Sequence, residues 1–299
     1  MKKIQTYISV IAIILVSCEK DYESAAPTAT INVLDNRIFV GQEAFFYGLN
    51  ATNFWDVSQE YSVRWDFQSN DNWDTHFSSH LVGSYVYNTT GNYKVTMQVI
   101  DLYGFSNKAA KSINVVNPPS FNYGTITDTR DGETYKTINI GNQTWMADNL
   151  RFNWSGIARV YNDNPSFLPT YGRLYQAHMA EGSCPAGWRL PTKGEWEILI
   201  NYLGGNNLAG KRLKQIGNNT WMSPNIADNE SGFNALPGGH HFIQYGSGWS
   251  YGGLGEFGAY WTSTKSGNFN YHVLLQNSTS AATITTGLNH FRSVRCIKN

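Results

Sequence analysis

Residues 184–203 read CPAGWRLPTKGEWEILINYL, and this stretch decides the architecture of the C-terminal half of the chain. Thr192 and Glu195 have the spacing of a capping box, in which each side chain accepts a hydrogen bond from the other residue's backbone N–H. Apolar residues then recur at intervals of three and four on one helix face: Trp196, Leu199, Ile200 and Leu203. The glycines at 204–205 end the pattern. The sequence therefore predicts a helix with one buried face.

Strand-like segments lie on both sides of this helix. Arg130-Asp131-Gly132 predicts a hairpin, because Asp-Gly suits a tight turn. A second helix is expected over residues 208–216, closed by Gly217. Alternating or apolar segments predict strands at 123–127, 134–138, 260–263, 271–276, 282–285 and 293–297. We therefore expect residues 121–299 to form one α+β domain.

Residues 28–117 have a different texture, with short alternating segments and no helical period. The expected strands are 30–33, 43–48, 61–67, 92–100 and 111–115, separated by Gly, Asn and Asp clusters. This spacing over about 90 residues favours a β-sandwich. Pro118-Pro119 cannot continue a strand, so we place the domain boundary there and expect two independently folding units.

The first residues are typical of an exported protein. Lys2 and Lys3 precede an apolar run over residues 8–16, shorter than the roughly 20 residues needed to cross a bilayer. Leu15-Val16-Ser17-Cys18 resembles the bacterial lipobox. The resemblance implies that residues 1–17 are a lipoprotein signal peptide and that lipid on Cys18 holds the protein to a membrane. An ordinary signal peptide with a chance cysteine is the alternative.

Residues 18–27 are polar and small, as expected of a tether. Their charged, acidic stretch at 19–23 resembles the surface-export signal of Bacteroidetes lipoproteins. The resemblance implies an outer membrane lipoprotein exposed at the cell surface. A solvated tether without a signal is the alternative.

Composition narrows the class of protein. Lys+Arg and Asp+Glu number 22 each, and losing Lys2 and Lys3 leaves 20 against 22, a net charge of −2. Because the chain has no surplus of Lys and Arg to neutralise phosphates, we do not expect nucleic acid as a partner. Charged residues make up 15% and aromatic residues 14%, which favours an extracellular β-rich binding protein over a cytosolic enzyme.

The chain has three cysteines. If Cys18 carries lipid, Cys184 and Cys296 remain, and an even remainder in an oxidising compartment predicts one disulfide. Two buried free thiols are the alternative, because sequence alone cannot show that the sulfurs meet.

The N-terminal half resembles the PKD (polycystic kidney disease) domain. The matching residues are Gly41-Gln42, Arg64-Trp65-Asp66-Phe67, residues 85–95 and residues 99–104. The resemblance implies an all-β immunoglobulin-like sandwich that acts as a spacer or a contact module. The family's usual Trp-Asp-Phe-Gly-Asp-Gly is replaced after Phe67 by Gln68-Ser69-Asn70-Asp71, which puts its tight turn in doubt.

The C-terminal half resembles the Fibrobacter succinogenes major paralogous domain, an exported module. The matching residues are 131–150, 171–175, 184–192, Glu195-Trp196, 230–239, 260–264 and 293–296. Arg189-Leu190-Pro191-Thr192 with Arg295-Cys296 is also similar to the formylglycine-generating enzymes. Both resemblances imply a C-type-lectin-like α+β fold with paired chain ends. The formylglycine-generating enzymes need reactive thiols. Because Cys184 and Cys296 are expected to form a disulfide, enzyme chemistry of this type is the least favoured function here.

Two other polar groupings in the sequence have explanations that need no ligand. His76 and His80 could share a metal, but exposed sandwich histidines explain them. Four oxygen-bearing residues could bind calcium, but turn chemistry suffices: Asp66, Asn70, Asp71 and Asp74. The calcium-linked lectin tripeptides Glu-Pro-Asn and Trp-Asn-Asp do not occur. We therefore expect no catalytic residues, no metal and no cofactor.

The most distinctive stretch runs from residue 240 to residue 253. Its glycines predict an irregular loop, on which aromatic side chains could stack against a ligand or fill the core. The candidate ligand-binding residues are His240, His241, Gln244, Tyr245, Trp249 and Tyr251. The favoured function is binding of a glycan or a protein by this domain. The alternatives are a structural envelope or appendage component and, third, an enzyme.

Overall fold

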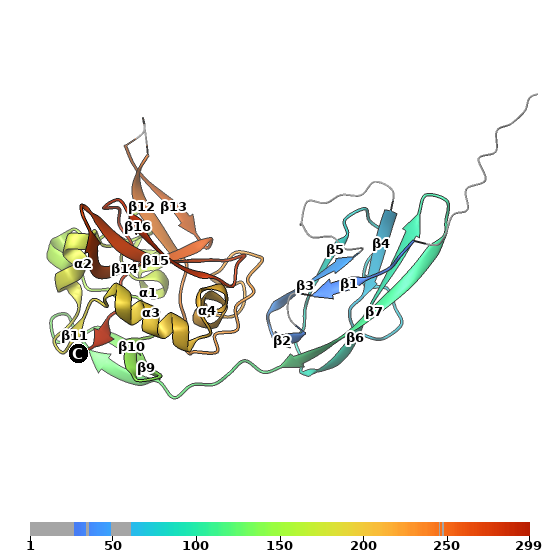
Figure 1. The fold of residues 1–299 in the computed structure, drawn as a ribbon, viewed down its shortest axis with the longest axis horizontal. Coiled ribbons are helices and arrows are strands. Elements are labelled where there is room, and N and C mark those ends of the chain that lie inside the picture. The colour runs from blue at the N-terminus through green and yellow to red at the C-terminus, as the bar shows by residue number, and fades with distance from the viewer. Residues whose placement is uncertain (1–26, 34–35, 49–60, 245, 247) are drawn as a thin grey trace, which may run out of the picture.

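The computed structural model describes residues 27–33, 36–48, 61–244, 246 and 248–299. The signal peptide, Cys18 and the tether up to residue 26 lie outside the described residues. Figure 1 shows two domains side by side along the long axis, joined by an extended segment between β7 and β8. Within the described ranges, no helix has the length and apolar character needed to cross a membrane.

The N-terminal domain consists of two β-sheets, with strand orders β1-β3-β5 and β2-β7-β6-β4. The described strands are β1 (Ile31–Val33), β2 (Arg37–Phe39), β3 (Glu43–Gly48), β4 (Tyr61–Asp66), β5 (Val82–Val86), β6 (Gly91–Asp101) and β7 (Ser106–Val116). Strand β6 alternates as predicted, with Val95, Met97 and Val99 fully buried between the sheets. Burying alternate residues on two facing sheets produces the expected sandwich core.

The core of this domain is rich in aromatic side chains. Trp65 stacks on Phe67 at a centroid distance of 5.8 Å, and the hydroxyl of Tyr87 donates to the backbone oxygen of Phe67 at 2.9 Å. Strands β2 and β5 were not predicted, because neither has a long alternating pattern. The other five strands lie where the sequence placed them, within one residue at their ends, except that β7 begins five residues before the predicted start.

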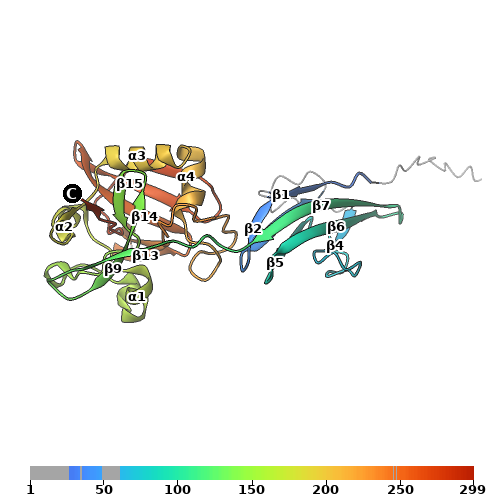
Figure 2. The same cartoon turned by 90° about the horizontal axis from the view of Figure 1, so that it is seen from below.

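The C-terminal domain contains two five-stranded sheets and short helices. Its strands are β8 (Gly124–Thr127), β9 (Thr134–Ile140), β10 (Gln143–Met146), β11 (Trp188–Arg189), β12 (Gly238–Gln244), β13 (Gly248–Leu254), β14 (Phe257–Ser266), β15 (Phe269–Gln276), β16 (Ala282–Gly287) and β17 (Ile297–Lys298). Its helices are α1 (Leu168–Tyr171), α2 (Ala177–Ser183), α3 (Lys193–Tyr202) and α4 (Asn206–Leu213). Figure 2 shows α3 and α4 on one side of the domain and α1 on the opposite side.

Helix α3 confirms the helix predicted from residues 184–203. Thr192 Oγ1 accepts from the Glu195 backbone N–H at 3.2 Å, and Glu195 Oε2 accepts from the Thr192 backbone N–H at 2.8 Å. Trp196, Leu199 and Ile200 are buried on its inner face. Helix α4 ends at Leu213, three residues before the predicted end, because Lys214 is extended.

The first and last strands of this domain share one sheet, in the order β11-β17-β10-β9-β8. Trp145 of β10 lies opposite Ile297 of β17. The disulfide between Cys184 and Cys296 joins the end of α2 to the residue before β17, with 5.9 Å between the Cα atoms. This confirms the predicted pairing and excludes the free-thiol alternative.

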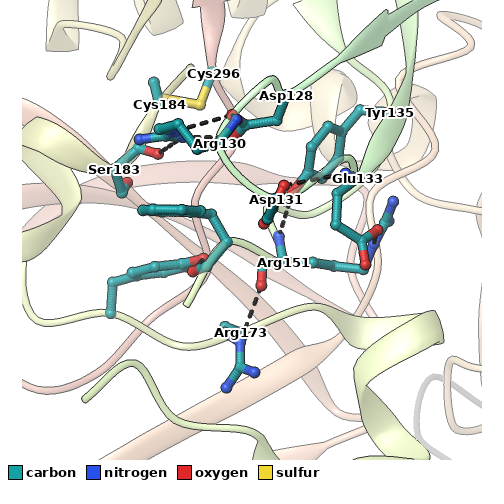
Figure 3. Close-up of polar contacts among 12 residues, drawn as sticks. Asp128, Arg130, Asp131, Glu133, Tyr135, Arg151, Arg173, Ser183, Cys184 and Cys296 are labelled. Atoms are coloured by element: carbon teal, nitrogen blue, oxygen red, sulfur yellow. Dashed lines mark hydrogen bonds and ion pairs between the residues drawn. A yellow bond between two sulfur atoms is a disulfide. The ribbon is translucent and has the colours of Figure 1, made fainter. Parts of the chain in front are cut away.

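Arg130 reinforces the region beside the disulfide (Figure 3). Its guanidinium donates to the Ser183 backbone oxygen at 2.7 Å and to Asp128 at 2.6 and 2.9 Å, and lies 3.7 Å from the centroid of the Phe152 ring. Backbone pairing and the disulfide thus hold β17, and Arg130 ties the residue before Cys184 to Asp128.

A fully buried arginine ties together three separate loops. The Arg295 guanidinium donates to the Asn149 side chain at 2.7 Å and to the backbone oxygens of Phe233 and Asn234 at 2.6 and 2.8 Å. Burial lowers the pKa of Arg295. Its hydrogen bonds satisfy a cation that would otherwise be costly to bury, so the arginine is structural.

The two domains also touch outside the linking segment. Gln42 Nε2 donates to the Ala227 backbone oxygen at 2.9 Å, and Glu43 Oε2 accepts from Asn218 Nδ2 at 2.8 Å and Ser223 Oγ at 2.6 Å. Gln42 is only 8% exposed. If the two domains moved apart, these hydrogen bonds would break. Independent folding of the two domains stays a prediction.

Candidate binding site on the β12–β13 hairpin

The expected irregular loop at residues 240–253 is instead a regular antiparallel hairpin. Strand β12 pairs with β13 so that His240 lies opposite Gly252, His241 opposite Tyr251 and Ile243 opposite Trp249. The prediction failed because these glycines make room for neighbours rather than breaking the strand. A Cβ atom on Gly252 would lie 3.0 Å from the Phe242 ring, a tight approach.

One face of the hairpin carries a cluster of aromatic rings in contact with one another. His241 stacks on Tyr251 at 4.2 Å between centroids, and Trp249 lies 4.9 Å from His241 and 5.4 Å from Phe291. His241 is 7% exposed, whereas Trp249 is 45% exposed. The indole of Trp249 therefore packs on the rings of His241 and Phe291 and leaves its outer surface exposed to solvent.

The other face of the hairpin holds the remaining predicted residues. His240 packs on Phe242 at 4.4 Å and on Phe257 at 4.8 Å between centroids. Because successive strand residues point to opposite faces, His240 and Gln244 lie across the hairpin from Trp249. Tyr245 lies outside the described residues. The structure thus brings together His241, Trp249 and Tyr251 and separates His240 and Gln244 from them.

Two shallow hollows adjoin Trp249, and together we call them the Trp249 groove. The first, of about 440 Å³, is lined by Gln176, Ile243, Trp249, Leu288, Asn289 and His290. The second, of about 400 Å³, is lined by Arg159, Asp163, Gln176, His241, Trp249, Tyr251 and Phe291. Trp249 and Gln176 line both, so a ligand that crosses the groove must contact the indole.

The groove combines apolar surface with planar polar groups. Ile243 and Leu288 are 58% and 60% exposed at one side of Trp249. On the other side, exposed Arg159 and Asp163 form an ion pair at 3.4 Å. The Tyr251 hydroxyl donates to Asp163 Oδ1 at 2.8 Å, which fixes this carboxylate beside the rings. Such a surface can stack on one part of a ligand and hydrogen-bond to another.

Burial disfavours the charged form of His241 and His290 in the hairpin region. Burial, then the nearby Arg159, lower the pKa of His241, and burial and Arg292 lower the pKa of His290. Among the described residues, His241 Nδ1 and His290 Nε2 are buried with no hydrogen-bond partner. A neutral ring tolerates such a nitrogen better than a charged one, so both histidines contribute ring surface at neutral pH.

The acidic residues for which the sequence predicts turn chemistry, Asp66 and Asp74, have local hydrogen-bond partners. Asp66 Oδ1 and Oδ2 accept from the backbone N–H groups of Gln68 and Asp71 at 3.0 and 3.1 Å. Asp74 Oδ2 accepts from Phe67 N at 2.7 Å. These are turn contacts of the kind expected of Asx residues. Over the described ranges, no three His, Cys, Asp or Glu residues are placed to hold a metal ion.

Most groove residues outside the hairpin were missed from the sequence. Arg159, Asp163 and Gln176 come from connections that carry no local signal. Phe291 reaches the site through an isolated bridge with His241, in which the two backbones exchange hydrogen bonds of 2.8 and 3.2 Å. Phe291 lies two residues before residues 293–296, which match the Fibrobacter succinogenes domain. This proximity was the one sequence feature that pointed to Phe291.

Comparisons with known proteins give two family matches. The Fibrobacter succinogenes major domain model matches residues 138–298, and the PKD domain model matches residues 29–114. No curated protein matches the chain. One solved structure is described as "Structural basis for the promiscuous specificity of the carbohydrate- binding modules from the beta-sandwich super family".

That alignment has 20% identity and a TM-score of 0.26, and covers 38% of this chain and 54% of the other. A TM-score this low does not establish a common fold. The alignment spans about half of that protein's chain. The assignment of this chain to a family therefore rests on the two family-model matches. More than half of the sequence matches the larger model, so this chain belongs to the Fibrobacter succinogenes major domain family, with a PKD domain preceding the family domain.

Proposed function

We propose that this chain is a non-catalytic cell-surface lipoprotein whose C-terminal domain binds a carbohydrate in the Trp249 groove. The observation that carries the proposal is the half-exposed indole of Trp249, supported from below by His241 and Phe291. Trp249 is not an isolated exposed residue, because the exposed side chains of Ile243 and Leu288 line the same hollow, and contiguous apolar patches mark interaction sites.

Sugars suit this surface because each ring has an apolar C–H face and a polar rim. The C–H face packs on an indole, and the hydroxyls need hydrogen-bonding groups at its edge. Asp163, Gln176 and Asn289 line the groove and offer oxygen and nitrogen atoms of that kind. The calcium-linked mode of lectins is not part of the proposal, since its tripeptides are missing from the sequence.

The rest of the molecule supports a displayed binding domain. The lipobox ending at Cys18 supplies an anchor and the PKD domain supplies distance from the membrane. The sheet that β17 shares with β8, β9 and β10, together with the flanking helices α3 and α4, supports a C-type-lectin-like fold for the C-terminal domain. Cys184 and Cys296 are joined to each other, which leaves neither thiol for chemistry of the formylglycine-generating type.

A protein partner is the second candidate, and one observation favours it. Ile243 and Leu288 widen the exposed apolar area beside Trp249, and sugars have little use for aliphatic side chains. A structural envelope component would use this area to contact a neighbouring protein.

A glycan array with the mature chain tests the proposal. We expect wild-type protein to bind a discrete set of glycans and Trp249→Ala to lose that signal. Phe269→Ala is the matched control, because Phe269 is an aromatic residue of similar exposure, 46%, on a different hairpin.

The outcomes separate the candidates. Loss of signal in Trp249→Ala with retention in Phe269→Ala supports the groove. No glycan signal for folded wild-type protein, with Trp249-dependent capture of an envelope protein instead, contradicts the carbohydrate proposal and favours the structural one.

A further inference from the structure

The tip of the β6–β7 hairpin in the PKD domain is apolar and exposed. Leu102, Tyr103 and Phe105 are 77%, 63% and 47% exposed in the turn between these strands. Elsewhere in the described part of this domain, the large apolar side chains of comparable exposure are Phe77 and Val86. Single exposed apolar residues are ordinary, but three within four positions form a patch that calls for a covering surface.

The turn presents these side chains on a defined backbone. Asp101 Oδ1 accepts from the backbone N–H groups of Tyr103 and Phe105, both at 2.9 Å. The Asp101 backbone N–H donates to the Phe105 oxygen at 3.0 Å, and Gly104 has a φ of +88° that suits glycine. These bonds also offset the carboxylate charge at the tip. A preformed turn loses little conformational entropy on contact with a surface.

The chain enters the sandwich at the same end as this tip. Strand β2 runs parallel to β7, with Arg37 opposite Asn114, so the chain before β2 approaches from the end where β7 begins. Figures 1 and 2 both show the described chain starting beside the β6–β7 tip, at the end of the molecule away from the C-terminal domain.

The length of the tether limits how far this end can lie from the anchor. Pro27 is the ninth residue after Cys18. Nine residues reach at most about 30 Å, even if the chain is fully extended. The tip is therefore kept close to whatever surface holds Cys18.

We propose that the β6–β7 tip rests in the interfacial layer of the bilayer that holds lipidated Cys18, a contact that depends on the anchor proposed above. Aromatic side chains are favoured at this depth of a membrane. Lys108, the third residue of β7, is exposed and supplies a cation for lipid phosphates. With lipid and tip as two attachments, the sandwich stands on the membrane, and the C-terminal domain, which lies at the other end of the molecule in Figures 1 and 2, is held away from the bilayer.

Depth-dependent quenching in vesicles tests this contact. The full chain carrying Tyr103→Cys is reconstituted in vesicles of phosphatidylethanolamine and phosphatidylglycerol, and the new thiol is labelled with a nitrobenzoxadiazole dye. Nitroxide on the lipid acyl chains is the quencher. Phe269→Cys on the C-terminal domain is the matched control, and a third chain adds Leu102→Ser and Phe105→Ser to the labelled tip.

We expect the label at position 103 to be quenched about twofold more than the label at 269, and the two serine substitutions to remove the difference. Equal quenching at 103 and 269, in a chain that sediments with the vesicles, overturns the tip contact and leaves the anchor intact. A chain that does not partition into membranes at all overturns the anchor and the tip contact together. Neither result bears on sugar binding by the groove.

Discussion

Removing the disulfide is the change whose effect on stability follows most directly from the structure. The double variant Cys184→Ala with Cys296→Ala deletes the bond and avoids burying a hydroxyl where Cys296 is 0% exposed. We expect the C-terminal domain to fold but to be much less stable. The native position of β17 survives, because β10 and β11 still pair with it and Arg130 still binds Ser183.

The magnitude follows from the loop that the bond closes. The two cysteines are 112 positions apart, for which the chain-entropy model gives about 4.8 kcal/mol at 25 °C. Domains of this size are stable by about 5–15 kcal/mol, so the loss is a large share of the total. The effect acts on the unfolded chain, which gains freedom when the loop is opened.

Denaturant unfolding, followed by near-ultraviolet circular dichroism and tryptophan fluorescence, measures this loss. The PKD domain contains none of the cysteines in the bond, so its own transition is an internal control. Reduced wild-type protein should match the double variant. A loss of less than about 1 kcal/mol in a variant with a native spectrum would refute the chain-entropy argument for this domain.

Three further changes have defined outcomes. Cys18→Ala should release the protein from membranes or stall its processing, and unchanged membrane partition with normal maturation would count against the anchor. His272→Phe should reduce acid sensitivity, because burial first and then Arg292 lower the pKa of His272 to about 3. The unfolded ring binds a proton below about pH 6.5 and the folded ring does not, so stability is full above that pH and falls by up to about 1.4 kcal/mol per pH unit toward pH 3. Urea titrations from pH 7 to pH 4 should show a smaller slope for the variant, and equal slopes would exclude His272 as a source. Gln42→Ala removes the contact to Ala227, so limited proteolysis after Pro119 should become faster, with a stable fragment starting near residue 120; no such fragment from either protein would contradict independent folding.

Local chemistry made much of the fold predictable from the sequence. The capping box at Thr192 and the spacing of Trp196 and Leu199 define α3 without reference to any other part of the chain. Strand β6 was found because burial between two sheets imposes a strict alternation on Val95, Met97 and Val99. The disulfide was predictable because an even number of cysteines remained once Cys18 was assigned to lipid.

The candidate site was only partly predictable, for two physical reasons. Glycine favours both turns and close packing, and in β13 the packing role dominates, since Gly252 makes room for Phe242. The other reason is distance along the chain. Phe291 and Asp163 reach Trp249 and Tyr251 only through tertiary contacts, and a pairing such as His241 with Phe291 leaves no periodic mark in the sequence.

Trp249→Ala tests the binding claim most directly, if stability and affinity are measured on the same variant. Trp249 is 45% exposed, so its truncation should cost about 1–2 kcal/mol of unfolding free energy, below the roughly 3–5 kcal/mol of a buried tryptophan. Calorimetric titration with a glycan found by the array should show at least a tenfold loss of affinity, about 1.4 kcal/mol. A well-folded Trp249→Ala protein that binds the glycan as tightly as wild type would contradict the account.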